Sequence, residues 1–127
     1  MPVTLRVVLN VSSFGEVVTF YRDLLGLPVV GGWDGGPDDR GALLQVADGG
    51  VIEVVGHGPC FSTPRYTDLA VAIELEDRQR VDALYRRLTS AGASTSEPAE
   101  QPWGHYSTTV RDPVDVEIVL YTHLVRS

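Results

Sequence analysis

The sequence predicts an α+β fold in which one strand–helix–strand unit occurs twice. Two observations predict the repeat. A helix end that reads Phe20-Tyr21-x-x-x-Leu25-Gly26 returns in altered form at Leu84–Gly92, and an apolar strand precedes each of the two helices. The length of 127 residues fits a single domain, within which two tandem βαβββ modules would share the chain.

The first module is expected at about 3–56. Its first strand is predicted at 3–11, where β-branched and large apolar side chains predominate. Ser13 and Glu16 have the spacing of a capping box, which predicts a helix start, and Gly26 predicts its end. The buried stripe of this helix is expected at Phe14, Val17, Val18, Tyr21, Leu24 and Leu25. Three strands are expected at 29–33, 42–47 and 51–55, with a flexible loop at 34–39.

A linker rich in glycine and proline, at about 57–66, leads to the second module at about 67–123. Asp77 is placed to cap a helix that runs through Ala91 and ends at Gly92. The buried stripe of this helix is expected at Val81, Leu84, Tyr85 and Leu88. Strands are expected at 69–75, 106–111 and 115–122, with an extended segment at 94–102 and a turn at Asp112-Pro113.

Composition narrows the class of partner. The net charge is −7, and Lys and Arg form no cluster, which argues against nucleic acid or an anionic membrane and is compatible with a cationic ligand. No apolar run approaches the roughly 20 residues of a membrane span, and residues 1–20 lack the pattern of a signal peptide. Cys60 is the one cysteine, so a disulfide framework within the chain is excluded. We therefore expect a cytoplasmic protein.

Four stretches in this order carry a family resemblance: Phe20–Leu27, Val51–Val54, Pro102–Gly104, and Asp112-Pro113 before Val116–Leu120. The chain resembles the glyoxalase / bleomycin-resistance / extradiol-dioxygenase superfamily, which has the vicinal oxygen chelate fold. The resemblance implies curved mixed sheets around a pocket, with a helix on the outer face of each, and a homodimer.

Enzymes of that superfamily hold a divalent metal with His or Glu on the first and last strand of each module. The resemblance puts the matching positions at Arg6, Glu53, Asp68 and Val119. Arginine is a permanent cation that repels a metal ion, and valine has no donor atom. We therefore expect no metal and no cofactor, as in the metal-free bleomycin-resistance-like binding proteins.

Strand alternation gives each strand a pocket-facing set and a helix-facing set. The pocket-facing residues are expected to be Arg6, Val8, Asn10, Val51, Glu53, Val55, Asp68, Ala70, Ala72, Glu117, Val119 and Tyr121. The helix-facing residues are expected to be Leu5, Val7, Leu9, Leu69, Val71, Ile73, Val116, Ile118 and Leu120. Because a buried charge is costly unless it is paired, we expect Arg6 to contact Glu53 or Asp68.

Aromatic residues in loops are the other candidate ligand contacts. Trp33, Phe61 and Trp103 are candidates for stacking on a flat ligand, with Tyr121 on the last strand. Alternatively, Trp103 anchors its loop in the core and Trp33 fills a dimer interface. His105 is expected to share a face with Trp103 if the segment is extended, whereas His57 and His123 are expected to be loop and terminal residues.

The first functional hypothesis is a metal-free binding protein that sequesters an aromatic drug or natural-product precursor, with cationic molecules among the candidates, in antibiotic resistance or as a biosynthetic accessory. The ligand-binding set is then Arg6, Trp33, Glu53, Phe61, Asp68, Trp103, His105 and Tyr121. The alternative is a glyoxalase- or dioxygenase-like lyase or isomerase that uses a non-standard metal site or Glu53 as general base. A third reading is an accessory domain whose pocket has collapsed.

Overall fold

The computed structural model describes residues 1–58, 60–62 and 64–124. The chain forms two compact units. The first unit covers Met1–Arg65 and the second begins at Tyr66. Each unit holds one sheet and one helical region. Within the described residues, no helix is long and apolar enough to cross a membrane.

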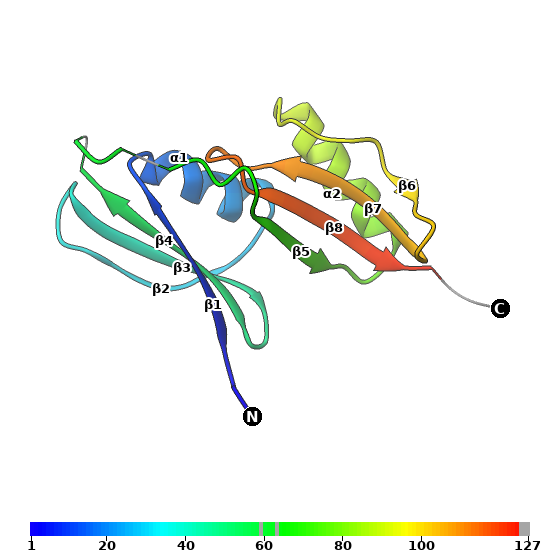
Figure 1. The fold of residues 1–127 in the computed structure, drawn as a ribbon, viewed down its shortest axis with the longest axis horizontal. Helices are drawn as coiled ribbons and strands as arrows, with labels where there is room; N and C mark the ends of the chain where they lie inside the picture. The colour runs from blue at the N-terminus through cyan, green and yellow to red at the C-terminus, as the bar shows by residue number, and fades with distance from the viewer. Residues whose placement is uncertain (59, 63, 125–127) are drawn as a thin grey trace. The chain divides into compact units, whose positions relative to one another are not determined.

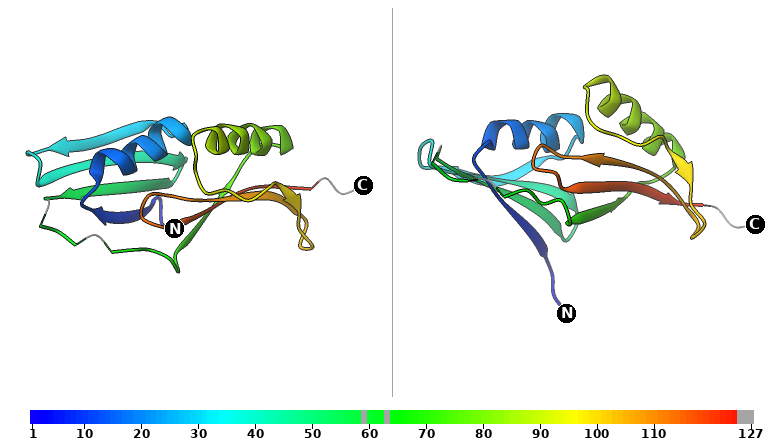
Figure 2. Two further views of the ribbon diagram at one scale, coloured as in Figure 1. Left: turned by 90° about the horizontal axis from the view of Figure 1, so that it is seen from above. Right: turned by 45° about the horizontal axis from the view of Figure 1, so that its top comes forward.

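The first unit is a four-stranded mixed sheet with its helical segment on one face (Figures 1 and 2). Its elements are β1 (Leu5–Val11), α1 (Phe14–Thr19), the π-helical turn η1 (Phe20–Leu24), β2 (Val29–Asp34), β3 (Asp39–Ala47) and β4 (Gly50–His57). The strand order is β1-β4-β3-β2, in which β1 and β4 are parallel and the other pairs antiparallel.

The second unit repeats this topology, with α2 on one face of its sheet (Figure 1). Its elements are β5 (Ala70–Glu74), α2 (Arg78–Ser90), β6 (Ala99–Glu100), β7 (His105–Arg111) and β8 (Glu117–His123). The order is β5-β8-β7-β6, with β5 and β8 parallel. The predicted α+β class and βαβββ repeat are therefore confirmed.

Helix α1 starts directly after Ser13, as predicted, but the predicted capping box is wrong because the Ser13 side chain makes no capping hydrogen bond. The helix then widens into η1, where the Leu25 N–H donates to the Phe20 carbonyl at 3.1 Å. Phe20 and Tyr21 are both buried, with edge-to-face rings 5.1 Å apart. Gly26, with φ of 74°, ends the helical segment as predicted.

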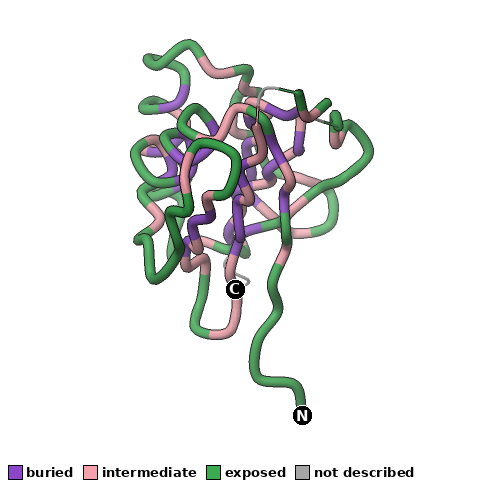
Figure 3. The backbone as a smooth tube through the Cα atoms, turned by 90° about the vertical axis from the view of Figure 1, so that its left-hand side faces the viewer, coloured by how far each residue is buried: buried purple, intermediate pink, exposed green. Residues whose placement is uncertain are grey.

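The core of the first unit lies between this helical segment and the sheet. Residues 1–6 lie outside this core and are exposed, as the N-terminal end of the tube in Figure 3 shows. The buried sheet residues on the helix side are Leu9, Val11, Ala42, Leu44, Ile52 and Val54. The expectation that Leu5 packs beneath the helix is wrong: Leu5 is the first residue of an edge strand and is exposed.

Helix α2 begins as the sequence predicts. Asp77 is its N-cap, and the Asp77 side chain accepts a hydrogen bond from the Arg80 N–H at 2.9 Å. Of the predicted stripe, Val81, Leu84 and Leu88 are buried and Tyr85 is half-buried. Gly92, with φ of 82°, follows the helix end.

The buried side of the second sheet is provided mainly by β7 and β8. Its buried residues include Ile73, Tyr106, Thr108, Val110, Ile118 and Leu120, and Val116 is buried directly before β8. The predicted turn at Asp112 is present: the buried Asp112 Oδ1 accepts from the Val114 and Val116 N–H groups at 2.8 and 2.9 Å. Leu69 was expected on the first strand of this module, but β5 starts one residue later and Leu69 is exposed.

Candidate functional site

The candidate site of the first unit is the side of its sheet that faces away from α1, which we call the first-unit face. Alternation and register place one set of side chains there: Arg6, Val8, Asn10, Trp33, Asp39, Gly41, Leu43, Val51, Glu53, Val55 and His57. The strand residues predicted for this face are therefore on it. Charged and aromatic side chains are interspersed with valines, which gives a mixed surface.

Arg6 and Glu53 form an ion pair on the first-unit face. The Arg6 Nη1 donates to the Glu53 Oε1 at 3.0 Å, which confirms the predicted contact. The Glu53 side chain is only 12% exposed, whereas that of Arg6 is 52% exposed. The half-exposed guanidinium therefore provides the hydrogen bond and the positive charge that the nearly buried carboxylate needs.

Trp33 lies flat across the neighbouring strand. Its Nε1–H donates to the Asp39 Oδ1 at 2.9 Å, and a Cβ added at Gly41 would overlap the benzo edge of the indole. The residue nevertheless remains 41% exposed. Trp33 thus occupies a defined place on the first-unit face with part of its surface open to solvent.

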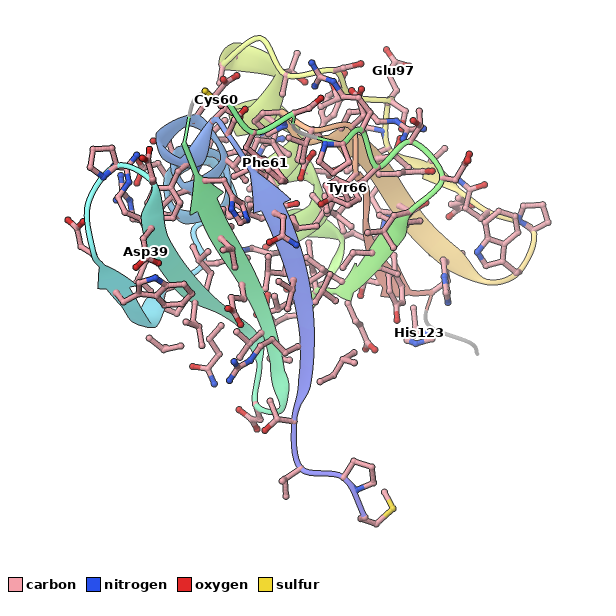
Figure 4. The ribbon with its side chains drawn as sticks, turned by 60° about the vertical axis from the view of Figure 1, so that its left-hand side comes forward. Asp39, Cys60, Phe61, Tyr66, Glu97 and His123 are labelled. Atoms are coloured by element: carbon pink, nitrogen blue, oxygen red, sulfur yellow. The ribbon has the colours of Figure 1, made fainter. Side chains whose placement is uncertain are left out.

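His57 and Phe61 form a second aromatic group in this unit. Their rings stack with centroids 4.2 Å apart and an interplanar angle of 25°. The His57 Nε2 and the Asn10 Oδ1 are 2.9 Å apart, within hydrogen-bond distance. The expectation that His57 is a loop residue is wrong, because it ends β4 opposite Asp39. Period-two spacing after Glu53 and Val55 was the signal that could have placed it on this face. Figure 4 labels Asp39 and Phe61.

The corresponding side of the second sheet, the second-unit face, carries a cluster of rings. His105 stacks on Tyr121 with centroids 4.4 Å apart, and His123 stands edge-on to His105 at 4.8 Å. The Glu74 Oε1 lies 3.7 Å from the His123 Nε2. His123, labelled in Figure 4, was expected to be a terminal residue, but it ends β8 and pairs in register with His105.

Two predicted site residues are placed differently from the prediction. Asp68 was expected on a strand, but it lies exposed in a turn, which the Leu69 N–H closes by donating to the Tyr66 carbonyl at 3.0 Å. Trp103 is 65% exposed in the turn at 101–104, so the alternative that it anchors its loop in the core is wrong. That turn also means that Trp103 and His105 do not share one extended strand.

The residues at the metal positions implied by the resemblance do not suit a divalent ion. Arg6 already bonds the Glu53 carboxylate, Val119 has no donor, and Asp68 is held in its turn. Across the described parts of the chain, no three His, Cys, Asp or Glu side chains are grouped to hold a metal ion. In the first unit, the Glu53 carboxylate therefore has the Arg6 guanidinium as its observed ionic partner.

The second unit also has an open cavity of about 660 Å³. It lies where the start of α2 meets β6 and the end of β8, and Glu76, Arg78, Glu100 and His123 are among its lining residues. Arg78 and Glu100 bridge within it at 3.0 Å. No lining residue belongs to the first-unit face, and only His123 is shared with the ring cluster.

Comparison with solved structures gives the fold's relatives. The YycE protein of Bacillus subtilis has a TM-score of 0.77 at 18% identity, covering 99% of this chain and 92% of that one. TnmS3, an antibiotic binding protein from Streptomyces sp. CB03234, scores 0.71 at 22% identity, with 94% of each chain covered. Lactoylglutathione lyase from Agrobacterium tumefaciens scores 0.69 at 16% identity, with 93% and 91% covered.

These identities are low and show the shared fold alone. No curated protein sequence matches the chain significantly. The family model described as Glyoxalase/Bleomycin resistance protein/Dioxygenase superfamily matches residues 4–120, which is nearly the whole chain. The chain therefore belongs to the glyoxalase/bleomycin resistance protein/dioxygenase superfamily.

Proposed function

We propose that this protein binds and sequesters a planar aromatic, cationic small molecule, such as a drug or a natural-product precursor. The observation that carries the proposal is the Arg6–Glu53 pair. The resemblance matches these two positions to metal-ligand positions of the superfamily's enzymes, and in this chain the carboxylate is bonded to a guanidinium. Binding by stacking and charge needs no metal, whereas the superfamily's metal-dependent reactions do.

Aromatic side chains of the first unit support a flat ligand. Trp33 is partly exposed on the first-unit face, and His57 and Phe61 form a stacked pair in the same unit. Offset or edge-on aromatic contacts contribute about 0.5–1.5 kcal/mol beyond the area that they bury. The aromatic side chains of this unit therefore favour ligands with fused aromatic rings.

Charge supports a cationic ligand. Asp39 lies beside Trp33 on the first-unit face. The whole chain carries a net charge of −7, which attracts cations over long range. A cation over the face of a tryptophan gains about a further 0.5–2 kcal/mol.

The names of the structural relatives include both a binding protein and an enzyme. TnmS3 is called an antibiotic binding protein, and the Agrobacterium tumefaciens relative is called a lactoylglutathione lyase. The fold therefore serves both binding proteins and enzymes, and the residues must decide between them. Arg6 and Val119 are the residues that favour binding.

A cytoplasmic homodimer forms part of the proposal. The resemblance implies pairing of two chains, and the edge strand β2 exposes Val29 and Val30 at its start, away from Trp33. Exposed apolar edge strands are surfaces that another strand or subunit can cover. Sedimentation equilibrium should give twice the chain mass; a monomer at all concentrations would contradict this part of the proposal.

A thermal-shift screen against planar aromatic antibiotics and their precursors tests the binding function. Tryptophan quenching provides the second readout, and the variants W33F and W103F assign the signal to one indole or the other. We expect positive shifts with cationic fused-ring compounds and quenching that requires Trp33. Elemental analysis of the purified protein is the control: stoichiometric divalent metal would favour the lyase or isomerase alternative.

A further inference from the structure

Trp33 and Gly41 fit one another across the β2–β3 ladder. The two residues are partners in register, and a Cβ at Gly41 would overlap the Cη2, Cζ3 and Cε3 atoms of the indole. Gly41 is buried although it lies on the open first-unit face. The indole therefore lies directly on the backbone of β3, in space that any other residue at position 41 would fill.

Asp39 fixes the other side of the ring. Its Oδ1 accepts the Trp33 Nε1–H at 2.9 Å, and its carbonyl accepts the Gly35 N–H at 2.7 Å in the turn between the strands. A hydrogen bond to an ionised carboxylate is stronger than one between neutral groups. Packing at the benzo edge and this bond at the pyrrole nitrogen together define the orientation of the indole.

The residue before Trp33, Gly32, also has no room for a side chain. Gly32 has φ of 153°, and a Cβ there would overlap the Gly41 carbonyl oxygen. Strand β2 therefore approaches β3 closely at the residue that precedes the indole. Glycine at both 32 and 41 makes the flat placement of Trp33 possible.

Trp33 is held in place by these contacts, and the residue is still 41% exposed. Its rotamer freedom is lost and apolar area stays in water. Ordering a side chain before binding lowers the entropy cost of the binding step. We propose that Gly41 and Asp39 are positioning residues that hold Trp33 as a preformed stacking surface for a planar aromatic cation.

The surroundings of Trp33 favour this ligand class. Asp39 is the cross-strand partner of His57, whose ring stacks on Phe61. A carboxylate thus lies between two aromatic groups on one sheet face, an arrangement suited to a flat ring that carries positive charge. The inference rests on the proposed function for its ligand, but the preformed surface can be measured in the free protein.

The first experiment uses the unliganded protein in a W103F background, so that Trp33 is the one remaining indole. G41A should push the indole off β3, because the overlapping atoms are the far end of a side chain. We expect loss of the Trp33 near-ultraviolet circular dichroism band and stronger acrylamide quenching. G15A is the matched control, since a Cβ at Gly15 meets no atom within 4 Å.

Asp39 is tested with a conservative pair of variants. D39A should weaken the same dichroism band, whereas D39N keeps an acceptor oxygen and should retain it. If G41A gives the same dichroism and quenching as G15A, the positioning role is wrong. These measurements need no ligand, so they succeed or fail independently of the proposed function.

The second experiment measures binding of proflavine, a planar aromatic cation, by isothermal titration calorimetry. G41A and W33A should raise the Kd by about threefold to tenfold, the range expected for one lost stacking contact. G15A should bind like wild type. An unchanged Kd in G41A, with the indole shown to be displaced, would overturn the stacking role. Failure of wild type to bind proflavine would instead count against the proposed function.

Discussion

The Arg6 guanidinium bonds Glu53 diagonally across two parallel strands. Arg6 is level with Val51 in the β1–β4 register, and Glu53 is level with Val8, yet the Nη1 and Oε1 atoms are 3.0 Å apart. The two side chains differ strongly in exposure, at 52% for Arg6 and 12% for Glu53. The Glu53 carboxylate has little contact with water, so it depends on the ion pair for stabilisation more than the Arg6 guanidinium does.

This asymmetry predicts unequal effects of removing the two charges. R6M leaves a nearly buried carboxylate without its cation and should lower the free energy of unfolding by about 1–3 kcal/mol. E53Q retains an acceptor for a guanidinium that is half in water and should cost less than about 1 kcal/mol. Urea unfolding at neutral pH measures both variants. Equal or reversed costs would contradict the predicted asymmetry between the two partners.

The two helix starts predict different effects of removing the side chain at the N-cap. D77A removes an observed capping bond to the Arg80 N–H and should destabilise by about 1 kcal/mol. S13A removes a side chain that makes no capping bond and should change stability by less than about 0.5 kcal/mol. Thermal unfolding of the two variants side by side is the measurement. A loss in S13A as large as that in D77A would contradict the difference between the caps.

The turn before β8 depends on one carboxylate oxygen. D112A would leave the Val114 and Val116 N–H groups without the Asp112 Oδ1 and should cost about 2–4 kcal/mol. D112N keeps an acceptor oxygen of the same shape and should recover most of that loss. Chemical denaturation provides the comparison, and similar destabilisation by both substitutions would mean that the negative charge matters more than the acceptor.

Tyr106 should titrate late. Its hydroxyl donates to the Asp82 Oδ1 at 2.6 Å, and this bond, with burial as a smaller cause, raises the pKa of the Tyr106 phenol above its usual value of 10.0. The neutral phenol is therefore favoured in the folded state. Its stabilising effect should be complete below pH 10 and disappear as the pH rises through the folded-state pKa.

The variant Y106F tests this pH dependence. The difference in unfolding free energy between wild type and Y106F should be constant at neutral pH, at about 1–2 kcal/mol, and shrink only in the alkaline range. The difference in phenolate absorbance between the two proteins isolates Tyr106 from the other tyrosines. Titration of Tyr106 at or below the ordinary tyrosine pKa would contradict the hydrogen bond's effect.

The sequence predicted the repeated fold well, because apolar periodicity and helix-ending glycines are local signals. Gly26 and Gly92 end helical segments as expected, and Asp77 caps α2. Ser13 shows where a local pattern fails: its capping-box spacing is present, but its side chain does not cap. The π-helical turn at Phe20–Leu24 has no short sequence pattern that would have revealed it.

The candidate site was predicted in part. Alternation from Arg6 and Glu53 was enough to anticipate their contact, because both lie inside regular strands. His57 and His123 were missed because strand ends are uncertain by a residue or two, and each is the last residue of its strand. The packing of the Trp33 indole on Gly41 could not be anticipated, since it depends on the register between β2 and β3.

Metal-free binding of a planar aromatic cation is the central claim, and calorimetric titration of EDTA-treated wild-type protein with proflavine tests it most directly. Anthraquinone-2-sulfonate, a planar anion, is the comparison ligand. We expect saturable binding of proflavine without added metal and weaker binding of the anion. Binding that is absent in the treated protein and returns only with a divalent metal would contradict the claim.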